Sequence, residues 1–180
     1  MKTNPYAKLR GARIVACADI ETPLGTMSAL ATAKGLAALW FDARKRDRDG
    51  WAAHGADAQD GRHPAIAAAR RWLQAYWAGE DPTEIEVPLD LHGTPLQQAV
   101  WTALRAIPYG RTRSYGEVAA ACGLSRTAAA RATGAACGAN PVGLIVPCHR
   151  VLGAKGALTG FSAGIERKIA LLRHEGALLA

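Results

Sequence analysis

The spacing of apolar residues changes once along this 180-residue chain, and the change separates a strand-forming region from a helix-forming one. Three short apolar or alternating runs, each bounded by turn residues, predict a small antiparallel sheet: residues 13–20, 26–32 and 36–41. Beyond residue 94, apolar residues instead recur at helical spacing. We therefore expect an α/β amino-terminal domain over residues 1–92 and a mainly α carboxy-terminal domain over residues 93–180.

The amino-terminal region also carries a helical pattern and one further strand pattern. Residues 64–78 place apolar side chains at helical spacing, from Pro64, which suits a first turn, to Gly79, which ends the pattern. Residues 85–91 alternate strictly, which predicts a strand, and the proline within them places that strand at a sheet edge. We interpret the polar stretch 42–62 as a loop that can carry a short helix, with no function attached.

The carboxy-terminal region begins with a helix, for which Thr94 can act as the cap and Pro95 as the first residue. Two later segments, 114–122 and 126–137, have the length and the glycine-containing turn of a helix-turn-helix. The second segment is rich in alanine. Small side chains allow close approach to DNA without reading base edges, so we expect contact in the minor groove that does not depend on sequence. An alanine-rich packing helix is the alternative.

Charge and cysteine usage limit the class of protein. The net charge of +7, from 22 basic and 15 acidic residues, favours polyanionic partners without identifying one. The four cysteines show no CxxC pairing, so we expect thiols in a reducing compartment. Neither a cleavable leader nor a membrane-spanning run is visible, which predicts a cytoplasmic protein without membrane contact. No metal is expected, because Cys17 stands with only the distant His54 and His63.

The run 140–151 is apolar until it places the thiol of Cys148 next to the imidazole of His149 and the guanidinium of Arg150. Nearby positive charge favours the thiolate, which is the nucleophilic form of cysteine. Neighbouring side chains of a strand point to opposite faces, so Cys148 and His149 can cooperate only if the backbone turns or a water bridges them. Pro147 is suited to supply the turn. The alternative is a cysteine that serves as a small buried hydrophobic residue.

Two features after this run extend the pattern. The glycine-rich stretch 153–164 is typical of a flexible binding loop. A helical stripe then leads to Glu175, whose carboxylate could orient His149 and so complete a nucleophile, base and orienter with Cys148. The alternative for Glu175 is an ordinary surface residue near a helix end.

On these motifs the chain resembles the O6-alkylguanine-DNA alkyltransferase family, the methylated-DNA–protein-cysteine methyltransferases. The resemblance covers residues 93–176 and rests on Pro147-Cys148-His149-Arg150, with Asn140-Pro141 before it and Gly160-Phe161-Ser162 and His174-Glu175-Gly176 after it. The first ninety residues resemble the variable, RNase H-like amino-terminal domain of the family.

The resemblance implies a role for each matching position. Cys148 would accept the alkyl group, His149 would act as a base through a water, Glu175 would hold His149, Asn140 would brace the turn, and Tyr115 would assist proton transfer. The implied DNA-binding residues are Arg131, which would fill the gap left by an extruded nucleotide, and Ser114, Ala130, Ala132, Thr133 and Gly134. The implied substrate pocket consists of Trp101, Val146, Pro147, Phe161 and Ser162.

The function implied is direct repair of double-stranded DNA, with no cofactor and with a monomer as the default. An alkyl group on O6 of a flipped-out guanine would move irreversibly to Cys148, once per molecule; O4 of thymine stays open as a second substrate. Two alternatives stay open: a module that binds alkylated DNA without repairing it, and a Cys-His-Glu thiol hydrolase. Phe161 stands where the family often has tyrosine, and the missing hydroxyl would weaken binding by about 0.5 to 1.5 kcal/mol.

Overall fold

The computed structural model of the protein describes residues 9, 12–42, 62–124 and 126–178. Contacts within the chain divide it into two compact units, Met1–His92 and Gly93–Ala180. Nearly all of the loop predicted over residues 42–62 lies outside the described residues. None of the helices in the described ranges is both long enough and apolar enough to cross a membrane.

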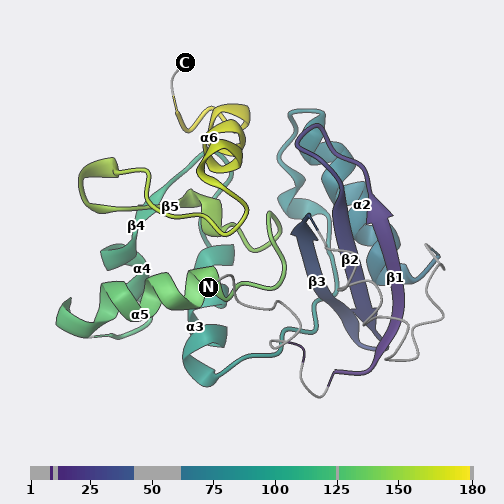
Figure 1. Ribbon diagram of the computed structural model, residues 1–180, viewed down its shortest axis with the longest axis horizontal. Helices are drawn as coiled ribbons and strands as arrows, with labels where there is room; N and C mark the ends of the chain where they lie inside the picture. Colours follow the sequence, from purple (N-terminus) through teal and green to yellow (C-terminus); the bar gives the residue numbers. More distant parts are fainter. Residues whose placement is uncertain (1–8, 10–11, 43–61, 125, 179–180) are drawn as a thin grey trace. The chain divides into compact units, whose positions relative to one another are not determined.

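Unit 1 is built on a three-stranded antiparallel sheet with the order β1-β2-β3. The strands are β1 (Ile14–Ile20), β2 (Met27–Thr32) and β3 (Gly35–Phe41), each within one residue of its prediction. All six residues of the central strand β2 are buried. Helix α2 (Pro64–Trp77) packs on the sheet and contacts all three strands, as Figure 1 shows. The expected small sheet with a helix is therefore present.

The predicted ends of α2 are confirmed, and each has a local cause. Pro64 occupies the first turn, where its missing N–H leaves no hydrogen bond unmade, and the Nδ1 atom of His63 accepts from the Ala65 N–H at 3.3 Å. Gly79 follows the helix with a φ of 83°, a conformation that glycine adopts without strain. Tyr76, buried on the inner face of α2, stacks on the Trp72 ring with the centroids 5.3 Å apart.

The strand predicted over residues 85–91 is wrong for most of its length. Only Leu89 forms a bridge, parallel to Leu36 of β3; the Leu36 N–H donates to the Pro88 carbonyl at 2.7 Å, and the Asp90 N–H donates to the Leu36 carbonyl at 2.9 Å. The alternation reflects an extended chain buried on one side, and Pro88 has no N–H with which to continue a ladder. Gly35 permits this close approach, because a Cβ there would lie 2.6 Å from the Pro88 oxygen.

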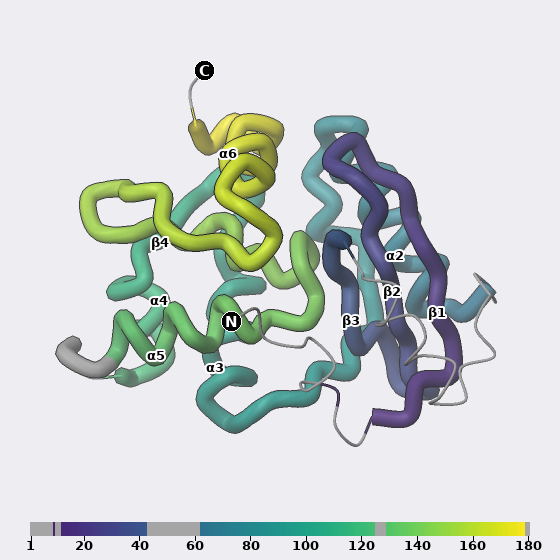
Figure 2. Tube along the Cα trace, viewed as in Figure 1, coloured from purple at the N-terminus to yellow at the C-terminus, as the bar shows by residue number. Residues whose placement is uncertain are grey.

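Unit 2 is mainly helical, as expected. Its elements are α3 (Pro95–Arg105), β4 (Arg113–Ser114), α4 (Tyr115–Ala121), α5 (Arg126–Gly138), η3 (Cys148–Arg150), β5 (Val151–Leu152), η4 (Ala154–Gly156) and α6 (Ile165–His174). Helix α5 contacts both α3 and α4. The short strands β4 and β5 pair in parallel, which brings the start of α4 beside the residues that follow η3. From β5 the chain runs out in a long loop before it returns as α6 (Figure 2).

The first two helices of unit 2, α3 and α4, have complete capping boxes. Thr94 caps α3 with Gln97 as its reciprocal partner, and Ser114 caps α4 with Glu117 in the same way. The predicted start of α3 at Thr94 and Pro95 is confirmed. Helices α4 and α5 follow each other across a short connection in which Gly123 has a φ of 70°. Their lengths and order fit the expected helix-turn-helix, which stays a prediction.

Trp101 fastens α3 to α5 in the core of unit 2. Its side chain is 1% exposed, and its indole N–H donates to the Ala136 carbonyl at 3.0 Å. A Cβ on Gly93 would lie 2.6 Å from the Trp101 ring, so glycine at this position permits the packing. The bond from the indole to the backbone fixes one end of α5, and α5 leads directly into the segment that carries the candidate site.

Candidate active site

The thiol of Cys148 lies in a tight turn that Asn140 braces. Cys148 begins the 3-10 turn η3, directly after Pro147, and is 7% exposed. The Asn140 amide donates to the Val146 carbonyl at 2.7 Å and to the Cys148 sulfur at 3.2 Å, and its oxygen accepts from the Val142 N–H at 3.0 Å. One side chain thus fixes the turn and directs an N–H at the sulfur.

Behind the thiol, His149 and Arg150 converge on the carboxylate of Glu175, which follows α6. The His149 Nε2 atom lies 2.6 Å from Glu175 Oε1, and both side chains are fully buried. Arg150 donates through Nε to Oε2 at 2.8 Å and through a terminal nitrogen to Oε1 at 3.1 Å, and its other terminal nitrogen donates to the Ile107 carbonyl at 2.7 Å. The Gly110 N–H adds a bond of 3.3 Å to Oε2. The carboxylate is therefore held from three directions.

This network sets the charge state of each partner. Burial alone would raise the pKa of Glu175, but the hydrogen bonds and charges of His149 and Arg150 outweigh it and hold that pKa at about 2. Burial lowers the pKa of His149 by more than its bond to Glu175 raises it. At neutral pH the pair is consequently a carboxylate next to a neutral imidazole.

A neutral His149 that donates from Nε2 to Glu175 carries its lone pair on Nδ1. That Nδ1 atom is buried and has no hydrogen-bond partner within the described part of the chain. Buried polar atoms are normally satisfied, so an unsatisfied one calls for a specific explanation. An imidazole that acts as a base would accept a proton at this atom.

Three further ionisable groups interact electrostatically with Cys148: Tyr115 on α4, Cys137 on α5 and Lys168 on α6. Burial, followed by the charge of Cys137, raises the pKa of the Tyr115 phenol, so it stays protonated at neutral pH. Burial, followed by the charge of Cys148, raises the pKa of Cys137 to about 12, so this second thiol is not a nucleophile at neutral pH.

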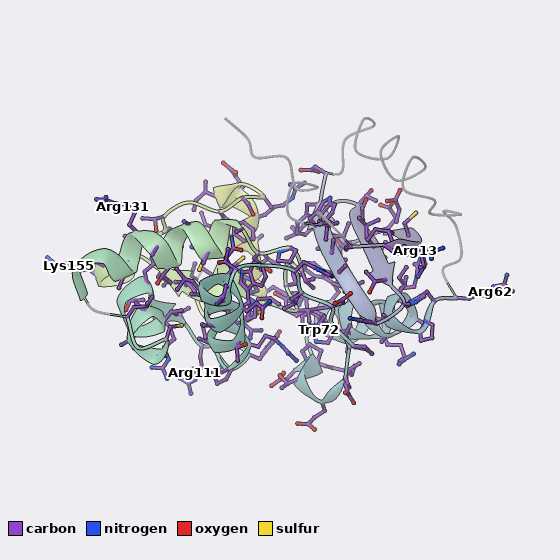
Figure 3. The ribbon with its side chains drawn as sticks, turned by 90° about the horizontal axis from the view of Figure 1, so that it is seen from below. Arg13, Arg62, Trp72, Arg111, Arg131 and Lys155 are labelled. Atoms are coloured by element: carbon purple, nitrogen blue, oxygen red, sulfur yellow. The ribbon has the colours of Figure 1, made fainter. Side chains whose placement is uncertain are left out.

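The exposed face of α5, in the part of the helix whose burial is described, carries small residues and Arg131. Ala130 and Arg131 are exposed there, and Arg131 projects away from the body of the unit (Figure 3). The charge of the chain is uneven: residues 93–180 carry ten basic and three acidic residues, whereas residues 1–92 carry twelve of each. The whole excess of positive charge therefore belongs to the unit that holds Cys148.

Comparison with known proteins gives consistent matches over both units. Residues 95–177 match the DNA binding domain of 6-O-methylguanine DNA methyltransferase, and residues 15–91 match its ribonuclease-like domain. The crystal structure of Mycobacterium tuberculosis OGT in complex with DNA is 43% identical in sequence, with a TM-score of 0.76 over 91% of this chain and 94% of that chain. The chain belongs to the methylated-DNA–protein-cysteine methyltransferase family.

Further relatives carry the family's name. The methylated-DNA–protein-cysteine methyltransferase of Mycobacterium tuberculosis is 58% identical over 111 residues, which are 62% of this chain and 66% of that protein. The protein of the same name from Salmonella typhimurium is 52% identical over 107 residues, or 59% of this chain and 61% of that protein. The chain thus matches just under two thirds of the length of these relatives. The O6-methylguanine-DNA methyltransferase of Pyrococcus kodakaraensis is 26% identical, with a TM-score of 0.63.

Several residues that the family resemblance singled out lie close together in unit 2, and their roles stay predictions. Cys148, His149, Glu175 and Asn140 meet around one turn, with Tyr115 in electrostatic contact with Cys148. Val146 and Pro147 are buried within the turn, Phe161 is half-buried and Ser162 is exposed. Ala130 is exposed, and Ala132 and Gly134 are half-buried. Trp101 is explained by its packing in the core, and its part in a substrate pocket stays a prediction.

Two of the predicted DNA-binding residues, Thr133 and Ser114, are not exposed. Thr133 is 0% exposed, so its prediction as a DNA contact is wrong. It lies four residues after Ala129 and four before Cys137, both buried, so helical spacing turns it inward. The hydroxyl of the half-buried Ser114 bonds with Glu117, donating to the carboxylate at 2.9 Å and accepting from its N–H at 3.2 Å, which makes it the cap of α4.

We predict that Thr133→Val stabilises the protein. The Thr133 hydroxyl is buried with no hydrogen-bond partner in the described residues, and burying such a group costs roughly 1 to 3 kcal/mol. Valine fills nearly the same space with a methyl group, so we expect a gain of about 1 kcal/mol in the free energy of unfolding. Urea denaturation measures it. Thr102→Val, on the exposed side of α3, is the matched control and should change stability by less than about 0.5 kcal/mol. A destabilised Thr133→Val protein would contradict the prediction.

Sequence reasoning missed two features. One is the set of partners that hold Glu175, and the other is the buried cation Lys168. Arg150 was expected to favour the thiolate, but its charge is neutralised by Glu175. Nothing in the sequence analysis indicated that the Gly110 N–H would contact Glu175. Lys168 is 0% exposed on α6, and the available signal was its position three and four residues before the buried Leu171 and Leu172.

Proposed function

We propose that this chain repairs DNA by transferring a methyl or other alkyl group from O6 of guanine to the sulfur of Cys148. The observation that carries the proposal is the Nδ1 atom of His149, which is buried with no hydrogen-bond partner among the described residues and lies on the same turn as a thiol that accepts a hydrogen bond from Asn140. A nucleophile, a base and a carboxylate that orients the base are the parts that such a displacement needs. The family to which the chain belongs supports this assignment.

In the proposed reaction the Cys148 thiol gives its proton to Nδ1 of His149 through a water. The resulting imidazolium donates from Nε2 to Glu175, whose carboxylate is ionised and 2.6 Å away. The thiolate then attacks the alkyl carbon, so an S–C bond forms as the C–O6 bond breaks. The Asn140 N–H stabilises the negative sulfur before the attack.

The electron pair of the broken bond stays on the guanine, which then takes up a proton. We assign that proton to the Tyr115 phenol, because its raised pKa keeps it protonated at neutral pH. Tyr115 regains a proton from the imidazolium or from solvent. The thioether on Cys148 offers water no bond that it can readily hydrolyse, so each molecule acts once.

DNA is the proposed partner, bound through unit 2. All the net positive charge lies in residues 93–180, and Arg111, Arg131 and Lys155 project from this unit (Figure 3). The small residues of α5 would lie in the minor groove without reading the sequence. A stacked guanine keeps its O6 substituent out of reach, so the nucleotide must leave the helix, at a cost of a few kcal/mol. Arg131 would occupy the space that it leaves.

Arg131→Ala tests this role. We expect the rate of transfer from duplex DNA to fall on the order of ten- to a hundredfold, because the flipped state loses the side chain that fills the gap. Transfer from the free base O6-benzylguanine should keep its rate, since no nucleotide is flipped. Arg105→Ala, which removes an exposed cation from α3, is the control and should retain the duplex rate. Equal losses on the free base and on the duplex would contradict the role.

Stoichiometry tests the proposed function itself. Excess duplex DNA with one O6-methylguanine is mixed with the protein, and the repaired guanine is counted over time. We expect one guanine repaired per protein molecule and then no further reaction. Continued turnover would indicate the thiol hydrolase, and binding without any loss of methyl from guanine would indicate a damage-binding module.

A further inference from the structure

Lys168 is a buried cation that the proposed reaction does not use. It lies on α6 with a side chain that is 0% exposed, and its ammonium group donates to the Val151 carbonyl at 2.6 Å and the Thr159 carbonyl at 3.0 Å. Lysine is rarely buried in this way, because taking an ammonium group out of water is costly. The burial of this ammonium group therefore indicates a specific role for Lys168.

The two carbonyls belong to two segments that follow the Cys148 turn along the chain. Val151 begins β5, directly after the turn that carries Cys148, and Thr159 lies in the 153–164 loop that leads to Ser162. The Thr159 side chain also acts on Tyr115, lowering the pKa of that phenol by less than burial raises it. One ammonium group thereby joins α6, the strand after the turn and the loop, so the loop cannot move independently of the thiol.

The charge of Lys168 has no carboxylate partner among the described residues; the anionic forms that act on it are those of Cys148 and Cys137. Cys137 stays protonated, since its pKa is about 12. In the proposed reaction Cys148 becomes a thiolate, and among the described residues it is then the anion whose charge acts on Lys168. Burial is the main cause of the lowered pKa of His149, and the charges of Arg150 and Lys168 lower it further.

We propose that Lys168 is a positioning residue of the transfer reaction, whose ammonium group anchors the 153–164 loop and favours Cys148 as the thiolate. The inference rests on the proposed function, because it needs Cys148 to be the acceptor. It assigns to Lys168 the role that sequence had given to Arg150, whose charge Glu175 neutralises. The ionisable groups that interact electrostatically with Cys148 are Tyr115 of α4, Cys137 of α5 and Lys168 of α6, and His149 is its neighbour in η3.

The test measures thiolate formation without DNA. Iodoacetamide alkylates the thiolate of Cys148 with loss of iodide, and mass spectrometry of the Cys148 peptide follows the rate across pH in the full-length protein. Lys168→Met removes the charge and the hydrogen bonds, whereas Lys168→Gln removes the charge and keeps a donor. We expect both variants to move the midpoint of the profile upward by about one pH unit, so that alkylation at neutral pH slows about tenfold. Arg173→Met, which removes an exposed cation from the same helix, should keep the wild-type midpoint.

A second measurement separates this role from DNA contact. Because Lys168 is fully buried, Lys168→Gln should bind O6-methylguanine duplex with wild-type affinity while transferring the methyl about tenfold more slowly. A folded Lys168→Gln protein with the wild-type midpoint would overturn the proposal, and so would a wild-type Cys148 that iodoacetamide labels at no pH. Failure of the proposed function would look different: the wild-type protein would leave O6-methylguanine DNA unchanged whatever its iodoacetamide profile.

Discussion

His149→Gln is expected to slow methyl transfer from duplex DNA by about 10² to 10⁴-fold at neutral pH. The amide nitrogen of glutamine can still donate to Glu175 Oε1, so the buried contact survives, but the basic Nδ1 atom is lost. The thiol must then lose its proton to solvent. Its thiolate fraction, and with it the rate, should rise about tenfold per pH unit until the thiol is ionised. Single-turnover transfer measured across pH checks both expectations.

The wild-type profile provides the comparison for this variant. Because burial lowers the pKa of His149, its neutral form persists at pH values below the ordinary histidine range. The wild-type rate should therefore hold as the pH falls through about 6.5, where an unperturbed histidine becomes protonated. A His149→Gln protein that keeps the wild-type rate at neutral pH would remove His149 from the reaction.

Glu175→Gln is expected to cost about 3 to 5 kcal/mol of the free energy of unfolding. The substitution leaves the guanidinium of Arg150, whose side chain is 6% exposed, without its counter-charge. Removing one partner of a buried pair is far more costly than removing one of an exposed pair. Glu117→Gln is the matched control: its partner Arg113 is 56% exposed, and we expect a loss of less than about 1 kcal/mol. Similar losses in the two variants would show that the Glu175 network contributes little.

Acid should reproduce part of this loss in the wild-type protein. The folded protein holds the pKa of Glu175 at about 2, below the ~4.3 of an unfolded chain. A carboxyl group with a depressed pKa stabilises above its unfolded pKa, and that stability disappears as the pH falls toward the folded pKa. We expect about 3 kcal/mol to be lost between roughly pH 5 and pH 2. Urea denaturation at a series of pH values should show a weaker dependence in Glu175→Gln.

The parts of this protein that sequence predicted are those set by local chemistry. The start of α3 follows from a threonine cap and a proline in the first turn, and the strands of unit 1 follow from short apolar runs between turns. A turn at Cys148 was one of two ways in which His149 could cooperate with it, a bridging water being the other, and Cys148 begins a 3-10 turn. The proximity of Glu175 to His149 was inferred from chemistry, and the two atoms lie 2.6 Å apart.

The parts that sequence missed depend on which way a side chain faces. The resemblance placed Thr133 on DNA, although the packing of α5 turns it inward. The stripe expected on α6 ran through Ile165, Ile169 and Leu172. Leu172 is buried, but the two isoleucines are half-buried, whereas Lys168 is fully buried. Hydropathy argues against a buried lysine, and only the two carbonyls that meet it explain its position. Tertiary packing decided each of these cases.

The central claim is that the sulfur of Cys148 receives the alkyl group. Duplex DNA that carries one O6-methylguanine with a deuterated methyl group is incubated with the protein, which is then digested and mapped by mass spectrometry. We expect a single labelled methyl group on the Cys148 peptide and none in Cys148→Ala. Label on Cys17, Cys122 or Cys137, or release of labelled methanol from an unlabelled protein, would contradict it.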